Sequence, residues 1–193
     1  YNIRKELGLP SDAFLLINVA NNRVMKGIPY LLEAMNLLPA GFPIHLILIG
    51  KNMANKTNLK IIDKGNKKNN IHLLDYRKDV LNCVASCNAF VLPSIFGESI
   101  TKSVIEAMCL EIAPVISDIP GNKELVINNE SGIVVASKNA KELSEAILKL
   151  YNNRALCKEL GKNAKKRIVN HLNIAQTILK TKKLYEDIKI KKV

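Results

Sequence analysis

Two glutamates with seven residues between them, Glu98 and Glu106, stand on either side of a predicted helix start. The apolar run 89–92 stops at Pro93, and apolar residues recur at helical spacing from Val104 onward, so a strand leads through a turn into a helix. Backbone N–H groups at a helix start lack partners and attract an anion, while carboxylates accept hydrogen bonds from hydroxyl groups. The stretch therefore predicts a site for a nucleotide joined to a sugar.

The pieces of this stretch also allow a purely structural interpretation. Ser103 and Glu106 match the capping-box pattern, in which the serine caps the helix and the glutamate folds back onto the serine N–H. Glu98 by itself would be a loop carboxylate in water. The ordered combination of strand, Pro-Ser turn, first glutamate and later Glu-Ala-Met favours the binding site over either piece alone.

A basic loop, 20–27, is the second candidate, because it contains Arg23 and Lys26 and no acidic residue. It joins a continuous apolar run, 14–19, typical of a strand buried on both faces, to a segment with helical periodicity. Guanidinium and ammonium groups at such a place can hold a diphosphate and offset the charge that develops on it as it leaves. The alternative is a pair of solvated surface cations.

Other residues that could do chemistry give weaker signals. Arg77 follows a short predicted strand, 71–75, and suits an exposed cation as well as a ligand contact. His45 alternates with apolar residues, which favours a satisfied core or edge histidine over a catalytic one. No C-x-x-C pair occurs, and although two of the four cysteines lie four residues apart on a predicted helix, we expect buried free thiols rather than a metal site. The cysteines are Cys83, Cys87, Cys109 and Cys157.

Strands alternate with helices along the chain, and each parallel pair of strands needs a crossover between them. The pattern predicts an α/β fold, a doubly wound, Rossmann-like parallel sheet of about six strands flanked by helices, with extra C-terminal helices. In such sheets ligands bind beyond the carboxyl ends of the strands. Because the basic loop and the segment 98–102 both follow strands, we expect them to meet at that edge.

The bulk composition is that of one ordinary α/β domain. The chain has 193 residues, 48% of them apolar, and we expect a single domain over 1–193 with a linker at 1–12 and C-terminal helices at 153–193. No apolar run is long enough to span a membrane, no signal peptide is visible, and the first residue is not Met, so we read the chain as a piece of a longer protein. The sequence has neither a G-x-G-x-x-G after the first strand nor a Walker motif, which disfavours dehydrogenases and kinases.

The positive charge is concentrated near the C-terminal end. Residues 138–193 contain 15 basic and 5 acidic residues, a net of +10 out of +12 for the whole chain. Lys158, Lys162 and Lys165 form a basic stripe on a predicted helix, which we interpret first as a solvated face and second as a contact with anionic membrane. A nucleic-acid-binding module is the competing explanation, but only 5% of the residues are aromatic and no RNP, KH or helix-turn-helix pattern occurs.

The first stretch resembles the E-x7-E region of the family 4 (group 1) glycosyltransferases, enzymes of the two-domain GT-B fold. In that family the C-terminal domain holds the nucleotide-sugar donor. The resemblance assigns the sugar contact to Glu98, the ribose hydroxyls to Glu106, and the leaving diphosphate to Lys26 and Arg23. It gives the same diphosphate to the intervening backbone amides, those of Ser99, Ile100, Thr101 and Lys102.

Some positions depart from the family pattern. Where many members have Gly-Phe-Gly after the first glutamate, this chain has Ser-Ile-Thr, which makes the sugar pocket bulkier. Many members also place an arginine five residues before Lys-Gly, where this chain has Asn21, and the nearest arginine is Arg23. The loop that carries Arg77 lies near the nucleotide base in the family.

The resemblance covers about 14–188 and implies the nucleotide-sugar-binding domain of a retaining, metal-independent glycosyltransferase of hexosyltransferase type. It implies a UDP-sugar donor, no cofactor, and a glycan or lipid-linked acceptor in polysaccharide or lipopolysaccharide biosynthesis. The acceptor site would belong to an N-terminal domain absent from this chain, so we expect the fragment alone to be inactive or poorly active. We expect a cytoplasmic protein, peripheral at the inner face of the membrane. The alternatives are a non-catalytic basic module that binds nucleic acid or anionic membrane, and another GT-B activity such as sugar-nucleotide epimerisation.

Overall fold

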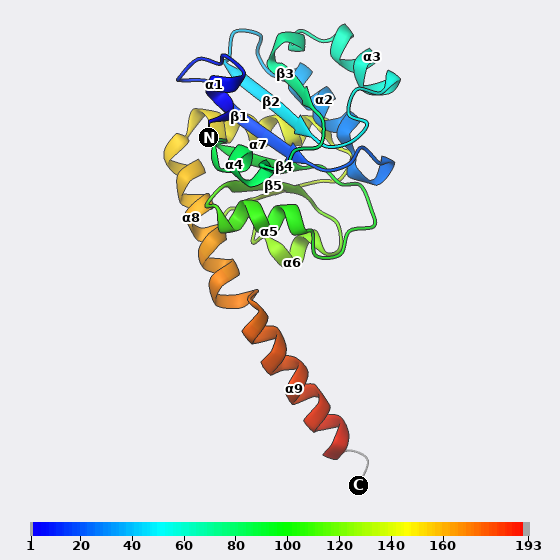
Figure 1. Ribbon diagram of the computed structural model, residues 1–193, viewed down its shortest axis with the longest axis vertical. Coiled ribbons are helices and arrows are strands. Elements are labelled where there is room, and N and C mark those ends of the chain that lie inside the picture. Colours follow the sequence, from blue (N-terminus) through cyan, green and yellow to red (C-terminus); the bar gives the residue numbers. More distant parts are fainter. Residues whose placement is uncertain (1, 191–193) are drawn as a thin grey trace.

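A six-stranded parallel sheet forms the centre of the computed structural model, which describes residues 2–190 of the chain and the side chains of residues 2–188 (Figure 1). The strands lie in the order β3-β2-β1-β4-β5-β6, and every neighbouring pair is parallel. This confirms the predicted doubly wound, Rossmann-like sheet of about six strands. The strands are β1 (Phe14–Val19), β2 (Ile44–Ile49), β3 (Ile71–Leu74), β4 (Ala89–Leu92), β5 (Ala113–Ser117) and β6 (Ile133–Val135).

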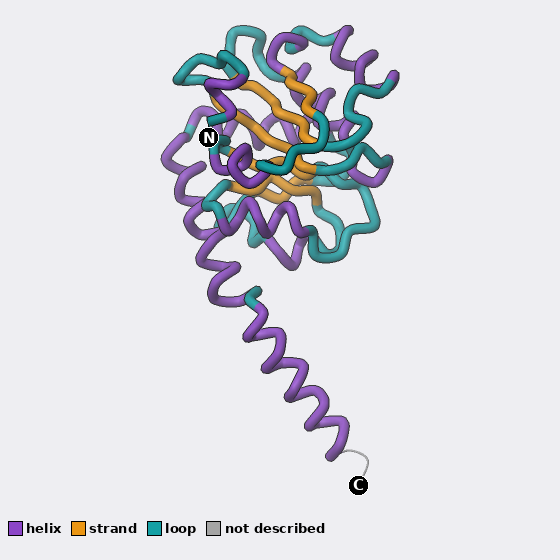
Figure 2. Tube along the Cα trace, in the orientation of Figure 1, coloured by secondary structure: helices purple, strands orange, loops and turns teal. Residues whose placement is uncertain are grey.

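Helices cover both faces of the sheet (Figures 1 and 2). Most of them follow a strand and return the chain to the other end of the sheet, as parallel pairing requires. The helices are α1 (Ile3–Glu6), α2 (Ile28–Leu37), α3 (Lys56–Lys64), α4 (Val80–Ala85), α5 (Lys102–Cys109), α6 (Asn122–Leu125), α7 (Ala140–Asn152), α8 (Arg154–His171) and α9 (Ile174–Ile190).

The strands are continuous apolar runs because both of their faces are buried. Alternate residues of β1 enter opposite cores: Phe14 and Leu16 pack with α2, α3 and α7, whereas Leu15 and Ile17 pack with α4, α5 and α8. All four side chains are completely buried. The sheet is therefore the shared wall of two hydrophobic layers, and it holds the ends of its strands in fixed positions.

Residues 2–12, from the segment that the sequence indicates as a linker, lie against the domain. Ile3 in α1 is completely buried in the core on the α5 side, and Arg4 donates hydrogen bonds to the carbonyl oxygens of Pro10 and Ala13 at 2.7 and 2.9 Å. A short helix with one apolar residue gives little sequence signal, so this packing becomes visible only in three dimensions.

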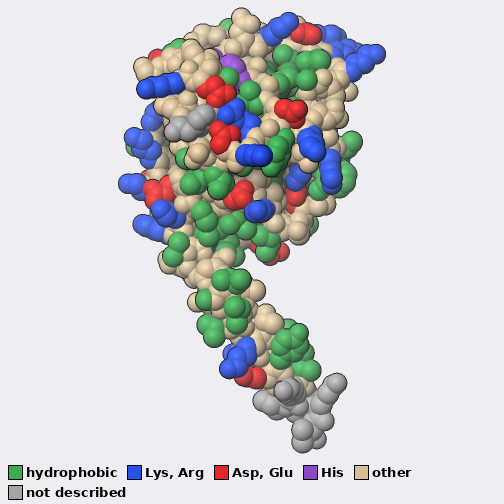
Figure 3. Space-filling model, viewed as in Figure 1, with side chains coloured by type: hydrophobic (Ala, Val, Ile, Leu, Met, Phe, Trp, Pro, Cys, Tyr) green, Lys and Arg blue, Asp and Glu red, His purple; other side chains and the backbone are tan. Residues whose placement is uncertain are grey.

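The extra C-terminal helices differ from each other in their packing. Helix α8 contacts α5 and β5, whereas α9 projects away from the rest of the molecule (Figures 1 and 2). Gly161 allows the close approach of α8, because a Cβ atom there would lie 2.0 Å from the carbonyl oxygen of Glu111. Hydrophobic side chains line the projecting helix in the space-filling view (Figure 3), and those of Ile174, Ile178 and Tyr185 are 78%, 60% and 65% exposed.

Candidate functional site

The two predicted motifs meet at the carboxyl ends of β1 and β4, which are adjacent in the sheet. The chain leaves β1 for α2 on one face and leaves β4 for α5 on the other face. Sheets of this type bind ligands where the strand order reverses, because the loops on either side diverge there. The topology thus brings together two loops that are about 70 residues apart in sequence.

Lys26 and Glu98 are in direct contact at this place. Lys26 ends a short 3₁₀ turn, Val24–Lys26, and its Nζ donates to Oε1 of Glu98 at 2.5 Å. Only 16% of the lysine side chain and 7% of the glutamate side chain are exposed. The predicted convergence of the basic loop with the first glutamate is therefore confirmed.

Glu98 is held by further hydrogen bonds. The hydroxyl of Ser94 donates to Oε1 at 2.6 Å, and the hydroxyl of Thr101 donates to Oε2 at 3.2 Å. Burial raises the pKa of this carboxyl, but the hydrogen bonds from Lys26, Ser94 and Thr101 and the charge of Lys26 outweigh burial and hold the pKa below its usual value. Glu98 is thus an ionised, positioned acceptor.

The backbone brings these loops together through Gly27. Its φ of 62° lies in the left-handed region, and a Cβ atom there would lie 2.0 Å from the carbonyl oxygen of Pro93. Next to it, the N–H of Ile95 donates to the carbonyl oxygen of Met25 at 2.8 Å. Any side chain at position 27 would push the Lys26 loop away from the Glu98 loop.

The start of α5 presents free backbone donors beside Glu98. Thr101 is the N-cap, but its side chain caps no N–H and instead bonds to Glu98 and Asn122. Within the described part of the chain, the N–H groups of Ser99, Ile100, Thr101 and Lys102 have no hydrogen-bond acceptor. The capping-box interpretation of Ser103 and Glu106 is wrong, because the helix begins one residue before Ser103.

Glu106 lies one turn inside α5. Its side chain is 29% exposed, and Oε1 is 3.5 Å from Nζ of Lys102, which is itself 89% exposed. An exposed pair of this kind is weak, so the carboxylate stays available to a ligand.

A second glycine secures the loop before α5 from the other side. Gly121 has a φ of 85°, and a Cβ atom there would lie 2.1 Å from the carbonyl oxygen of Ser99. The next residue, Asn122, is completely buried and accepts a hydrogen bond from Thr101 at 3.4 Å. The turn at 118–122 therefore buttresses the segment that carries the free N–H groups.

The two candidate arginines have different surroundings. Arg23 is exposed and lines a cavity with Asn22 and Tyr30, a cavity that neither Lys26 nor Glu98 lines. The position of the family arginine, Asn21, accepts a hydrogen bond from the Lys51 N–H at 3.1 Å.

Arg77 is held by carboxylates of the domain itself. Its guanidinium lies 2.9 Å from Asp79 and 2.6 Å from Glu6, and these bonds raise its pKa above the ordinary value. Through these two ion pairs Arg77 connects α1 to the loop before α4. Its contact with a ligand stays a prediction.

A cavity at the carboxyl ends of β2 and β3 was not predicted as part of the site. It has a volume of about 330 Å³ and lies next to Gly50, whose backbone approaches that of Ala20 closely. The sequence signal for it was the glycine that ends a buried strand. Its lining residues are Gly50, Asn52, Met53, Ala54, Leu73, Leu74 and Asp75.

The remaining candidates have structural surroundings. His45 is 9% exposed and its Nδ1 lies 3.1 Å from Nε2 of His72, which confirms a satisfied histidine near the sheet edge. Cys83, Cys87 and Cys157 are buried as predicted, but the prediction is wrong for Cys109, which ends α5 on the outer side and is exposed.

In the basic stripe, Lys165 forms an ion pair with Glu111 at 2.8 Å. No helix among the described residues has the length and apolar content needed to cross a membrane.

The sequence of the chain is similar to those of known glycosyltransferases. The family model for glycosyl transferases group 1 matches residues 1–167. The chain is 27% identical to an Escherichia coli UDP-Gal:alpha-D-GlcNAc-diphosphoundecaprenol alpha-1,3-galactosyltransferase over 97% of its own length and 49% of that protein. It is 31% identical to a Campylobacter jejuni N,N'-diacetylbacillosaminyl-diphospho-undecaprenol alpha-1,3-N-acetylgalactosaminyltransferase over 83% of its length and 41% of that protein.

The fold is shared with solved structures. The crystal structure of Anabaena HepE in complex with UDP-glucose superposes with a TM-score of 0.83 at 20% identity, over 93% of this chain and 50% of that chain. The chain spans about half the length of the relatives it matches. From the match over residues 1–167 and the sheet-edge geometry that accompanies it, the chain belongs to the glycosyl transferases group 1 family.

Proposed function

We propose that this chain is the nucleotide-sugar-binding domain of a retaining glycosyltransferase that needs no metal ion. The observation that carries the proposal is the contact between Lys26 and Glu98 beside the free N–H groups at the start of α5. A cation, an ordered carboxylate and a helix N-terminus together provide what a diphosphate linked to a sugar requires. The family membership supports the same assignment.

The diphosphate would bind between Lys26 and the N–H groups of residues 99–102. These donors place positive charge where negative charge grows as the sugar leaves, which lowers the barrier without a metal ion. The ammonium of Lys26 donates one hydrogen bond to Glu98 in the structure, and its other two N–H groups would donate to the phosphate when the donor binds. Arg23, three residues earlier, is exposed and lines a separate cavity, so it would add only longer-range positive charge to the diphosphate site.

The sugar and the ribose would each meet one of the two glutamates. Glu98 is ionised and held by Ser94 and Thr101, so it can accept hydrogen bonds from sugar hydroxyl groups in a defined direction. Glu106 is partly exposed and lies one helical turn further along, at a spacing suited to the ribose hydroxyls. The side chain of Thr101 restricts the space near Glu98, where glycine would leave it open.

The nucleotide base would enter the cavity at the ends of β2 and β3. This cavity of about 330 Å³ is within the range of small-ligand sites and is bordered by backbone at Gly50 and by Leu73 and Leu74. Because the Escherichia coli relative is named for UDP-Gal and the HepE structure contains UDP-glucose, we propose uracil as the base and a UDP-hexose as the donor.

The acceptor would be lipid-linked or a glycan, since both named relatives act on diphosphoundecaprenol-linked sugars. We propose that a further, N-terminal domain closes over the carboxyl edge of the sheet and supplies most of the acceptor site. On this proposal the 193-residue chain binds the donor but transfers its sugar poorly.

Calorimetry with UDP tests the donor site directly. We expect UDP to bind the chain, and we expect Lys26→Ala and Glu106→Ala each to weaken binding by roughly 10-fold, the loss of one charge-assisted hydrogen bond. Matched controls are Lys158→Ala and Glu159→Ala, which remove one charge of each sign from the exposed side of α8. Equal UDP affinity in the wild type and in both site variants would contradict the assignment.

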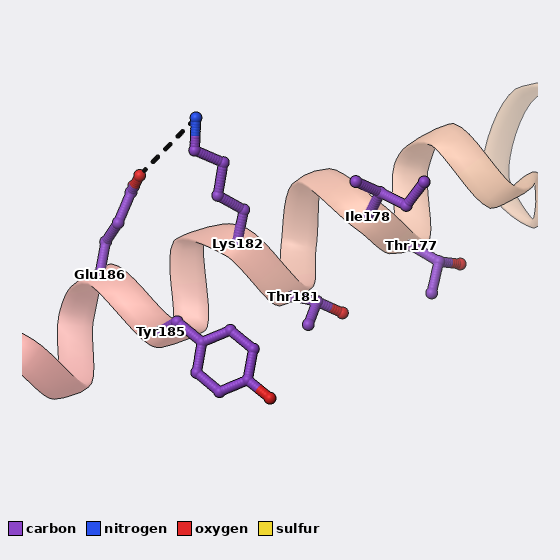
Figure 4. A pocket seen from close by; sticks show the side chains of 6 residues that line it. All are labelled: Thr177, Ile178, Thr181, Lys182, Tyr185 and Glu186. Carbon is purple, nitrogen blue, oxygen red and sulfur yellow. Dashed lines mark ion pairs between the residues drawn. The ribbon is translucent and has the colours of Figure 1, made fainter.

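We also propose that α8 and α9 place the protein at an anionic membrane surface. Ile174, Ile178, Tyr185 and Ile188 recur at helical spacing along one side of α9, and a close view of this side shows Ile178 and Tyr185 together with two threonines and the Lys182–Glu186 pair (Figure 4). Exposed apolar side chains together with lysines on one helix suit contact with an anionic membrane surface. Flotation with phosphatidylglycerol vesicles should bring the protein to the top of the gradient, and neutral phosphatidylcholine vesicles should not. Equal flotation with both, or with neither, would count against the membrane contact.

A further inference from the structure

A second cavity opens on the other side of the Lys26 loop, between α2 and α3. Its volume is about 510 Å³, and it is separate from the Lys26–Glu98 contact, because neither residue lines it. Its walls come from five parts of the chain: the loop after β1, α2, the loop after β2, the start of α3, and Ile95 in the loop after β4. Ile95 adjoins Ser94, which bonds to Glu98, so the cavity borders the donor site.

Two polar side chains in this cavity have no partner in the described part of the chain, whereas the amide groups of Asn22, Asn55 and Asn58 are hydrogen-bonded within the domain. Among the described residues, Tyr30 and Glu33 make no side-chain hydrogen bond or ion pair. Asn58 is 1% exposed, and its amide nitrogen donates to the carbonyl oxygen of Met53, but its Oδ1 accepts no hydrogen bond. A buried acceptor without a partner is costly, and this one lies in the wall of the cavity without exposed surface of its own.

The charge of the lining distinguishes this cavity from the donor site. The donor site has Lys26 and a helix N-terminus, which favour an anion, whereas the second cavity has one arginine and one glutamate that cancel, with several amides between them. Amides, a carboxylate and a phenol hydroxyl match the alternating donors and acceptors of sugar hydroxyl groups. Pro29, Ile95 and the Tyr30 ring provide apolar surface for the C–H face of a sugar ring.

We infer that this cavity binds an uncharged hexose unit of the acceptor glycan. The inference rests on the proposed glycosyltransferase function and deepens it, because it places part of the acceptor on this domain. Because the Lys26 loop lies between this cavity and Glu98, the unit held here would not be the one that receives the donor sugar. It would be another unit of the same acceptor, and binding it would orient the acceptor relative to the donor site.

Amide NMR titration of the ¹⁵N-labelled chain with the methyl α-glycosides of glucose, galactose and N-acetylglucosamine tests this inference. We expect at least one of them to shift amide signals of residues 22–30 and 52–58, with a millimolar dissociation constant. Glu33→Gln and Tyr30→Phe, which keep size and shape, should each raise that constant at least threefold. Glu159→Gln, on the exposed side of α8, is the matched control and should leave it unchanged.

A parallel calorimetric titration with UDP separates this inference from the proposed function. If UDP binds the wild type and both cavity variants equally while the glycosides shift no signal in these two segments, the acceptor subsite is wrong and the donor site stands. The same holds if the glycosides bind elsewhere, or if neither variant changes the constant. If UDP fails to bind while a glycoside still shifts these signals, the cavity is a sugar site and the transferase assignment fails.

Discussion

The carboxyl edge of the sheet and helix α9 are opposite in chemical character. At the edge, the central ion pair is mostly buried: Lys26 and Glu98 are 16% and 7% exposed, and Glu98 accepts hydrogen bonds from three residues. On α9, apolar side chains such as Ile174 and Tyr185 are 78% and 65% exposed. Groups at the edge are fixed before a ligand arrives, whereas α9 makes little contact with the rest of the chain.

This difference indicates two kinds of recognition. A preorganised polar site suits a small ligand, because its groups do not have to be ordered during binding. An exposed apolar helix face suits an extended surface, and it adds little to the stability of the domain. Substitutions at the edge should therefore change both stability and ligand binding, while substitutions on α9 should change neither.

The largest effect is expected for Gly27→Ala. A left-handed backbone costs a non-glycine residue about 1–2 kcal/mol, and the added Cβ would also collide with the Pro93 carbonyl oxygen, so we expect a loss of about 3 kcal/mol or more in the free energy of unfolding. Urea denaturation measures it. Gly8→Ala is the matched control, since Gly8 has the same φ of 62° with nothing within 4 Å, and should cost only about 1 kcal/mol. Equal losses of unfolding free energy in the two variants would mean that the close contact between Gly27 and Pro93 does not limit the residue at position 27.

The next effect should come from Lys26→Met, which keeps the apolar stem and removes the charge. Glu98 would lose its nearest cation inside a mostly buried site, so we expect a loss of about 2 kcal/mol in the free energy of unfolding. On α9, Lys182 lies 4.0 Å from Glu186 and both are exposed, so Lys182→Met should cost less than about 0.5 kcal/mol. Both losses can be measured by urea denaturation. Similar values would show that the buried ion pair at the sheet edge stabilises the protein no more than the exposed pair on α9.

Lowering the pH should decrease the free energy of unfolding, because Glu98 at the carboxyl edge of the sheet becomes protonated. Because its pKa is lower in the folded protein than in the unfolded chain, its stabilising contribution is complete above the unfolded pKa, near 4.5, and is lost as the pH falls through the folded pKa. In Glu98→Gln, the free energy of unfolding should therefore fall less steeply below about pH 5 than in the wild type. Glu186→Gln on α9 should leave that slope unchanged, and parallel curves for all three proteins would show that Glu98 gains nothing from its partners.

The smallest effect on stability is expected from the double substitution Ile178→Ser and Tyr185→Ser. Both side chains are mostly exposed, so the melting temperature should stay within about 2 °C of the wild type, while vesicle binding should fall. Ile168→Ser in α8 provides the contrast, because this isoleucine is 7% exposed and its replacement should cost at least about 2 kcal/mol. A large loss from the α9 substitutions would show that α9 packs on the domain in solution.

Much of the fold was predictable because its signals are local. The strands are unbroken apolar runs, and the predicted spans 14–19 and 89–92 coincide with β1 and β4. The parallel topology agrees with the alternation of strands and helices, since each parallel pair needs a crossover that a helix provides. The meeting of Lys26 with Glu98 was predictable for the same reason, because both follow strands that end at one edge.

Other features depend on partners that are distant in the sequence. Arg77 is held by Glu6, 71 residues away. The capping box at Ser103 does not form, because the helix begins at Lys102. The exposure of Cys109 and the burial of Ile3 reflect which side of a helix meets its neighbours. The cavity between α2 and α3 is formed by five parts of the chain, and only one of them, the basic loop 20–27, has a motif that the sequence singles out.

By itself, then, the sequence determined the order of strands and helices, the parallel sheet and the edge where the charged motifs meet, because hydrophobic runs and turn residues act over short distances. Only the tertiary structure decided which carboxylate pairs with which cation, which side chains stay free, and where cavities open. Those outcomes depend on distances between residues far apart in the chain, and packing sets those distances.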